Sequence, residues 1–242
     1  MTEPPRIVTP DSIARRDFLR IAAPAVPIVL AACGWDGGKR LQPVFDKVIA
    51  ANNALGEELL AVRHATADPR QVPHGQMPSY FVSKTMPVLS DPASWQLDVG
   101  GLVRKPTRFT RDMLGVLPHI SYSVTHHCVE GWSVVKPWAG VPFATIAALV
   151  EPTDAARYVQ FDSFDDGYMN GWDIESAMHP QTILADAFDG KPITPEHGAP
   201  LRLYSPIKLG YKLTKYLTRI TFTDQKPGGY WEDRGYPWFG GL

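Results

Sequence analysis

The sequence is organised around the stretch Thr125-His126-His127-Cys128-Val129-Glu130-Gly131-Trp132-Ser133. Cys128 is one of only two cysteines, and the other lies near the N-terminus. A thiolate is a soft ligand suited to transition metals, and a thiol can also serve as a catalytic nucleophile. Buried structural cysteines are common too. The motif alone leaves these three alternatives open.

Zinc and a thiol hydrolase are the first functions that this motif suggests. A structural zinc site takes four ligands, usually with a second Cys-x-x-Cys pair, and the sequence contains no such pair. A hydrolase would need a distant histidine, for which His179 and His197 are available. Zinc is therefore disfavoured, and the hydrolase has no local motif in its favour.

Composition narrows the class of protein. The chain has 242 residues, of which 44% are hydrophobic, enough for a sizeable core. The net charge of −1 gives no electrostatic case for binding nucleic acid or an acidic membrane surface. Its 23 prolines and 20 glycines favour a β-rich fold with many turns.

The N-terminus has the features of an export signal. Arg15-Arg16-Asp17-Phe18-Leu19 precedes a short apolar run that contains two prolines. The run is shorter than the roughly 20 apolar residues of a membrane-spanning helix, so we expect a twin-arginine signal over residues 1–32. Cys33 follows Leu30-Ala31-Ala32 and resembles a lipobox cysteine, with a chance cysteine beside a cleavage site as the alternative. Export would leave Cys128 without a disulfide partner.

Residue patterns predict the elements that follow. A helix is expected over 41–60, a linker up to 77, and one domain over 78–242, with a helix over 142–150 that starts at a proline. Gly100-Gly101 should end the first strand, Asp189-Gly190 should form a hairpin turn, and the aromatic tail over 230–239 should be coil packed back on the domain. Alternating residues predict strands over 95–99 and 120–124. Further strands are expected over 157–161, 168–174, 183–188, 201–204 and 217–222.

A second motif, far downstream, carries four cations within fourteen residues: Arg202, Lys208, Lys212 and Lys215. Arginine offers a planar fork for phosphate and lysine a point charge, and the turn near Gly210 can add backbone N–H groups. The cluster suits a phosphorylated cofactor. A solvated basic face on a pair of strands is the alternative.

Together the motifs resemble the sulfite-oxidase superfamily of molybdopterin enzymes, and most closely the catalytic subunits of the periplasmic protein-methionine-sulfoxide reductases. The resemblance covers roughly 78–223 and implies an α+β, mostly β, molybdopterin-binding fold. It also implies one pterin per molybdenum, with Cys128 as the metal ligand. The motifs that carry it are Cys128-Val129-Glu130 with Trp132-Ser133, Pro137-Trp138-x-Gly140-x-Pro142, His197-Gly198-x-Pro200-x-Arg202-Leu203 and Gly210-Tyr211-Lys212-x-x-Lys215.

The resemblance also assigns site residues. Cys128 and Glu130 are the expected catalytic residues. For His126 and His127 two interpretations stay open: they line the metal pocket, or they only end a strand. The expected cofactor contacts are Ser83, Lys84, Thr85, Ser163, His197, Arg202, Lys212, Leu213, Thr214 and Lys215.

Departures from the sulfite oxidases bear on the substrate. Ser83 replaces an arginine, Asp186 stands where those enzymes have an active-site tyrosine, and Glu130 would repel the sulfite dianion. We therefore expect reduction of a small or protein-bound S-oxide by oxygen-atom transfer. The alternatives are a sulfite-oxidising enzyme and a non-catalytic lipoprotein binding module with the same fold.

The expected setting is periplasmic or otherwise exported, with anchoring through Cys33 if that residue is lipidated. Electrons would come from a membrane or periplasmic partner. The chain ends soon after Phe239 and lacks both the dimerisation domain of animal and plant sulfite oxidases and a haem motif, so a monomer is expected.

Overall fold

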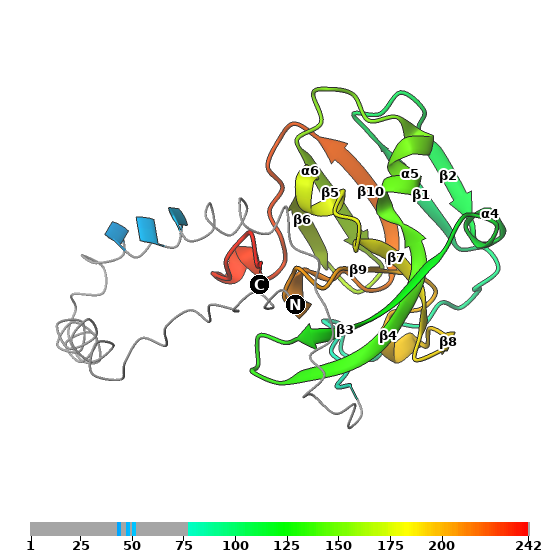
Figure 1. The fold of residues 1–242 in the computed structure, drawn as a ribbon, viewed down its shortest axis with the longest axis horizontal. Helices are drawn as coiled ribbons and strands as arrows, with labels where there is room; N and C mark the ends of the chain where they lie inside the picture. Colours follow the sequence, from blue (N-terminus) through cyan, green and yellow to red (C-terminus); the bar gives the residue numbers. More distant parts are fainter. Residues whose placement is uncertain (1–42, 45–46, 49, 52–76, 242) are drawn as a thin grey trace, which may run out of the picture. The chain divides into compact units, whose positions relative to one another are not determined.

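The computed structural model describes residues 43–44, 47–48, 50–51 and 77–241 (Figure 1). The described residues between 43 and 51 are helical and fall within the helix predicted over 41–60. The rest of that helix, the predicted export signal, Cys33 and nearly all of the linker lie outside the described residues. Within the described part of the chain, no helix combines the length and the apolar character needed to cross a membrane.

Two five-stranded sheets form the domain. The first has the order β2-β1-β10-β5-β6 and comprises β1 (Gln96–Gly101), β2 (Thr107–Thr110), β5 (Tyr158–Ser163), β6 (Met169–Asp173) and β10 (Leu217–Thr223). Within it β1 and β10 are parallel and the other pairs antiparallel. The second sheet has the order β3-β4-β7-β8, with β9 also paired to β7. It comprises β3 (Ile120–His127), β4 (Ser133–Pro142), β7 (Ile183–Phe188), β8 (Lys191–Pro192) and β9 (Arg202–Tyr204).

Short helices connect these strands. They are α4 (Arg111–Gly115), α5 (Phe143–Val150), α6 (Ile174–Ala177) and the 3-10 helices η1 (Pro195–His197), η2 (Gly210–Lys212) and η3 (Glu232–Arg234). Thr110 caps α4 by accepting the Met113 N–H, and Asp173 caps α6 by accepting the Ser176 N–H at 2.6 Å.

Alternating apolar residues build the core. Phe143 at the start of α5 packs against Phe161 of β5 and Phe222 of β10, with ring centroids 5.7 and 5.8 Å apart. Trp172 of β6 joins the same cluster, 5.7 Å from Phe161. All four rings are fully or almost fully buried. The first sheet is thereby tied to α5, which follows directly from β4 of the second.

The structure confirms most predicted elements and corrects the end of the first strand. Gly100 and Gly101 lie inside β1, paired with Thr221 and Phe222. Gly101 has φ +84°, and a Cβ there would lie 2.2 Å from the carbonyl oxygen of Phe222. Gly101 therefore allows a close approach of β1 to β10, and β1 runs through both glycines before it ends at Gly101.

The strand β4 was not predicted. It lies between β3 and β7 although it contains Pro137, and a proline within a strand pattern counts against a central strand. A register irregularity between Ala139 and Gly140 lets β4 pair with β7. The predicted turn does form, with Asp189 and Gly190 at φ +54° and +73° between β7 and β8.

Candidate active site

Cys128 lies at the tip of the long β3–β4 hairpin, directly after the last residue of β3. The Gly131 N–H donates to the Cys128 carbonyl and the Cys128 N–H to the Trp132 carbonyl, both at 3.0 Å. Gly131 has φ +89°, a conformation that glycine adopts at no steric cost. This tight turn fixes the position of the thiol, as the sequence predicted when it placed Cys128 just beyond a strand.

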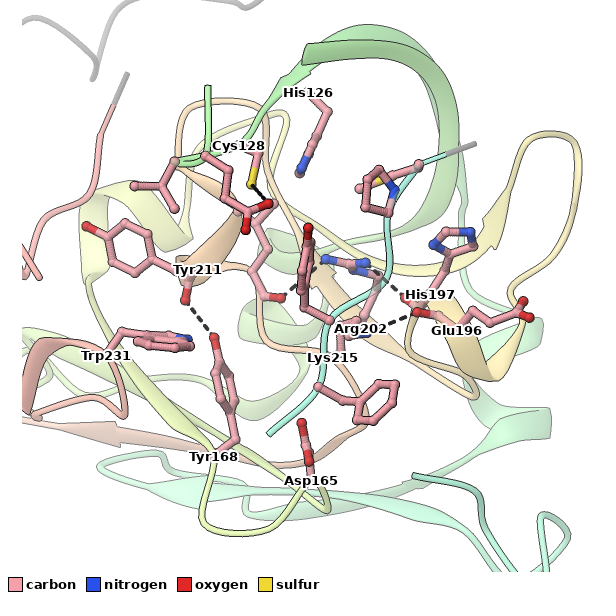
Figure 2. A pocket seen from close by; sticks show the side chains of 18 of the residues that line it. His126, Cys128, Asp165, Tyr168, Glu196, His197, Arg202, Tyr211, Lys215 and Trp231 are labelled. Atoms are coloured by element: carbon pink, nitrogen blue, oxygen red, sulfur yellow. Dashed lines mark hydrogen bonds between the residues drawn. The ribbon is translucent and has the colours of Figure 1, made fainter. Parts of the chain in front are cut away.

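A cavity of about 350 Å³ opens beneath the thiol. Figure 2 shows Cys128 above it, His197, Arg202 and Lys215 on one side, and Tyr168, Tyr211 and Trp231 on the other. We call the first group of three the cationic end. The aromatic end comprises Tyr168, Tyr211, Trp231 and Tyr236, all of which line the cavity.

At the cationic end, Arg202 is buried and has only neutral hydrogen-bond acceptors. Its guanidinium donates to the carbonyls of His197 at 2.9 Å, Leu213 at 3.3 Å and Leu203 at 3.4 Å, and lies 4.9 Å from the Trp138 ring. Burial lowers the pKa of Arg202 to about 10. Among the described residues, no carboxylate forms an ion pair with it.

Lys215 is in the same situation. Its Nζ donates to the Glu196 carbonyl at 3.0 Å and to the Ser79 hydroxyl at 3.3 Å, with no ion-pair partner in the described part of the chain. Burial and the nearby Arg202 lower the pKa of Lys215 to about 7. Burial, Arg202 and Lys215 likewise lower the pKa of His197 to about 4. Arg202 and Lys215 thus form no ion pair with a carboxylate of the described residues, although the charge of Asp165 raises the pKa of Lys215.

These residues fit a molybdopterin. A buried charge without a counter-charge is unfavourable, and the phosphate of a pterin cofactor would supply that charge to Arg202 and Lys215. Cys128 opens on the same cavity with a single soft sulfur ligand for the metal. Arg202, Lys215 and His197 would hold the anionic part of the group, and Cys128 its molybdenum.

Glu130 lies beside the thiol. Its Oε2 is 3.9 Å from the Cys128 Sγ and accepts the Trp132 indole N–H at 3.0 Å. Hydrogen bonds from the Tyr80 hydroxyl and from Trp132 lower the pKa of Glu130, whereas burial is the largest influence that raises the pKa of Cys128. A fixed carboxylate thus borders the cavity next to Cys128.

The alternation of β3 separates the two histidines that the sequence left ambiguous. His126 is buried and lines the cavity, with its ring 5.9 Å from Tyr204 and 5.6 Å from Trp132. Burial, together with Arg202 and His127, lowers the pKa of His126 to about 3, so its imidazole is neutral. His127 does not line the cavity, and its Nδ1 lies 2.9 Å from the Ser133 hydroxyl.

The structure brings seven of the predicted site residues to one cavity and leaves five outside it. Those lining it are Cys128, Glu130, Ser163, His197, Arg202, Leu213 and Lys215. Those outside its lining are Ser83, Lys84, Thr85, Lys212 and Thr214. Their assignment as cofactor contacts stays a prediction.

The five residues outside the lining have different surroundings. Lys84 and Thr85 are exposed. Lys212 is buried and paired with Glu232. Thr214 is buried, and its hydroxyl has no hydrogen-bond partner among the described residues. Ser83 is hydrogen-bonded to Asp165, a buried carboxylate that no sequence motif identified.

Asp165 anchors residues 77–83, which we call the strap. Its carboxylate accepts the Val82 and Ser83 N–H groups, both at 2.7 Å, and the Ser83 hydroxyl at 2.6 Å. Four strap residues line the cavity: Met77, Pro78, Tyr80 and Phe81. Asp165 lies more than 80 positions from Val82 and Ser83 in the sequence, so no local pattern could have identified it.

Comparisons with known proteins agree with this geometry. The family model described as "Oxidoreductase molybdopterin binding domain" matches residues 83–231. YedZ1 of Azospira oryzae, provisionally named a protein-methionine-sulfoxide reductase subunit, is 46% identical over 62% of this chain and 57% of its own. The protein-methionine-sulfoxide reductase catalytic subunit MsrP of Ralstonia nicotianae is 36% identical over 58% of this chain and 47% of its own.

The chain thus spans about half the length of the curated relatives it matches. The sulfane dehydrogenase SoxCD of Paracoccus pantotrophus has a similar fold, with a TM-score of 0.54 and 21% identity over 57% of this chain and 40% of its own. The predicted fold class and the molybdopterin cofactor are confirmed. The chain belongs to the family of molybdopterin-binding oxidoreductases.

Proposed function

We propose that the protein reduces an S-oxide by oxygen-atom transfer at a molybdenum ligated by Cys128. The observation that carries this proposal is the position of the Cys128 thiol, which opens on the same cavity as the buried Arg202 and the partly buried Lys215. Neither cation has a carboxylate ion-pair partner among the described residues. The names of the relatives, protein-methionine-sulfoxide reductase subunits, point to the same reaction class.

Each group has a distinct role in this reaction. The bound molybdopterin supplies the two-electron oxygen-transfer chemistry. The S=O bond breaks, the sulfur is reduced by two electrons from the donor, and the oxygen leaves as water after taking two protons. Arg202 and Lys215 hold the anionic part of the cofactor, Cys128 ligates its metal, and the neutral His126 adds no charge beside it.

Local charge favours an S-oxide over sulfite. Glu130 is held ionised next to Cys128 by hydrogen bonds from Tyr80 and Trp132, and an ionised carboxylate repels a dianion. The aromatic end contains no cation among its four residues. A neutral, dipolar S-oxide is not repelled by Glu130 and does not need a cation at the aromatic end. Sulfite oxidation is the second candidate, because Arg202 and Lys215 line the same cavity.

We also propose that the protein acts outside the cytoplasm and takes its electrons from a membrane or periplasmic partner. The paired arginines Arg15 and Arg16 and the position of Cys33 support export and lipid attachment. Cell fractionation tests both points. Replacing both arginines by lysine should keep the protein inside the cell, and Cys33→Ala should release it from the membrane without stopping export.

An assay of the molybdenum-loaded full chain in both directions tests the reaction. We expect methionine sulfoxide to be reduced with a reduced viologen dye as donor, and sulfite to be oxidised far more slowly with ferricyanide as acceptor. Faster oxidation of sulfite would overturn the proposal. Molybdenum-loaded protein without either activity would indicate the non-catalytic binding module. If metal-free protein shows hydrolytic activity, and alkylation of the thiol abolishes it, the protein would instead be a thiol hydrolase.

A further inference from the structure

The aromatic end of the cavity has no role in the chemistry described so far. Two of its four rings, Trp231 and Tyr236, come from the C-terminal tail. The Tyr236 ring lies 5.1 Å from Tyr211 and 5.2 Å from Trp231, at interplanar angles of 62° and 56°. Figure 2 shows Trp231 and Tyr211 on the side of the cavity away from Arg202. The tail thereby supplies half of this end.

The tail is fixed in place by contacts on several sides. Lys212 and Glu232 form a buried ion pair, and the Tyr211 hydroxyl donates to the Pro237 carbonyl at 2.7 Å. The Tyr230 N–H donates to the Met169 carbonyl of β6 at 3.0 Å. A wall held in this way is preorganised and loses little entropy when a ligand binds.

The hydrogen bonds of the four aromatic side chains leave two donors open. The Tyr168 hydroxyl donates to the Tyr211 carbonyl at 2.6 Å, and the Tyr211 hydroxyl is engaged with Pro237. The Trp231 indole N–H and the Tyr236 hydroxyl donate to no described residue. The aromatic end therefore offers apolar ring faces together with two neutral donors.

We infer that Trp231 and Tyr236 form the subsite that selects and orients the S-oxide. This inference rests on the proposed function. Sulfur and its alkyl substituents make favourable contacts with aromatic rings, and the S=O oxygen is a hydrogen-bond acceptor for neutral donors. A sulfite dianion would lose its hydration against the same rings without gaining a counter-charge. The substrate class that fits is a neutral alkyl sulfoxide, such as the side chain of methionine sulfoxide.

Kinetics on conservative variants of the molybdenum-loaded full chain test the subsite, with N-acetyl-methionine sulfoxide as the probe. Tyr236→Phe keeps the ring and removes the hydroxyl, and Trp231→Phe keeps a ring and removes the N–H. Each should raise KM about two- to tenfold, the range expected for the loss of one hydrogen bond. Trp231→Ala, which also removes ring contacts, should raise KM further. Molybdenum content should stay at the wild-type level in all three.

Trp238→Phe is the matched control. Trp238 belongs to the same tail, but its indole N–H donates to the Pro227 carbonyl at 2.6 Å and it does not line the cavity. We expect its KM to equal that of the wild type. Calorimetric titration of the oxidised, molybdenum-loaded protein with the same sulfoxide gives a readout independent of turnover, and its Kd should change in parallel with KM.

The outcomes separate this inference from the proposed function. An active wild type whose Trp231→Phe and Tyr236→Phe variants keep the wild-type KM and Kd overturns the subsite and leaves S-oxide reduction standing. A Trp238→Phe variant that changes KM as much as Trp231→Phe also overturns it, because tail packing would then be the cause. A molybdenum-loaded wild type that reduces no S-oxide overturns the proposed function itself.

Discussion

Lys215 at the cationic end and Lys212 behind the aromatic end lie three positions apart in the sequence, and the fold gives them opposite surroundings. Lys212 is fully buried, pairs with Glu232 and donates to the Gly171 carbonyl at 2.8 Å. Lys215 lines the cavity and has only a hydroxyl and a carbonyl as acceptors among the described residues. Burial lowers the pKa of both, to about 8 for Lys212 and about 7 for Lys215.

Basic residues that are close in the sequence can therefore have different functions in the fold. The carboxylate of Glu232 compensates Lys212, which thereby helps to hold the tail and the aromatic end. Lys215 and Arg202 have no such compensation within the described residues, which is the state expected of groups that await an anionic ligand. Substitutions at the two ends should therefore separate stability from cofactor binding.

Replacing Cys128, which borders the cavity between its two ends in Figure 2, should have the largest effect. Loss of a group that only supports a metal ligand lowers activity or metal affinity about 10–100-fold, and loss of the ligand itself should exceed that. Cys128→Ala should lower S-oxide reduction with a viologen donor more than 100-fold, about the upper end of that range. Because the thiol is only half-buried, the melting temperature of cofactor-free protein should hardly change.

Breaking the ion pair behind the aromatic end should mainly affect stability. Glu232→Gln leaves Lys212 buried without a counter-charge, which should lower the free energy of unfolding by about 3–5 kcal/mol. Urea denaturation measures this change. The double variant Lys212→Met with Glu232→Leu is the control and should recover much of the loss, because apolar side chains can replace a buried pair. A single variant as stable as the wild type would contradict the assignment.

Neutralising the cationic end should mainly affect cofactor retention. Lys215→Met and Arg202→Gln each remove a charged donor, and a hydrogen bond to a charged group is worth about 1.5–3 kcal/mol. We expect each variant to bind the cofactor about 10–100-fold more weakly than the wild type. The amounts of pterin and molybdenum that remain bound after dialysis measure this change. The cofactor-free Lys215→Met protein should unfold at the same urea concentration as the wild type, or a higher one. Unchanged retention in both variants would count against a phosphate at this end.

The pH dependence of stability offers a smaller and more specific effect. The pKa of Lys215 is about 7 in the folded protein, against 10.5 for an unperturbed lysine. Between these values the unfolded chain holds the proton and the folded protein does not, so the free energy of unfolding rises with pH. From pH 8 to 9, cofactor-free wild type should gain at most about 1.4 kcal/mol relative to Lys215→Met. Parallel curves for the two proteins would show that Lys215 titrates normally.

The smallest effect is expected in the strap beside the cationic end. Ser83→Ala removes one of three hydrogen bonds to Asp165 and leaves the two from backbone N–H groups. We expect a loss of about 0.5–1.5 kcal/mol and faster hydrogen exchange at the Val82 amide. Asp165→Asn, which weakens all three bonds, should speed that exchange further. Equal exchange in all three proteins would mean that Asp165 does not hold the strap.

The sequence predicted what depends on local pattern. Period-two alternation located β1 and β3, and the Asp189-Gly190 turn located the end of β7. The end of the predicted strand over 120–124 placed Cys128 on a loop. The sequence did not predict β4, because a proline such as Pro137 normally counts against a central strand. It grouped Lys212 with Lys215, because the partner of Lys212 is Glu232, twenty positions away and brought near only by tertiary folding. The same limit concealed the aromatic end, where Tyr168, Tyr211 and Trp231 come from three separate segments.

The number of sulfur atoms bound to the metal decides whether Cys128 is its ligand. X-ray absorption at the molybdenum edge, on full chain from a host that makes the cofactor, counts the sulfur neighbours of the metal. If Cys128 ligates the metal, Cys128→Ser protein that keeps its molybdenum should have one sulfur neighbour fewer than the wild type. An equal sulfur count in the two proteins would contradict Cys128 as the metal ligand.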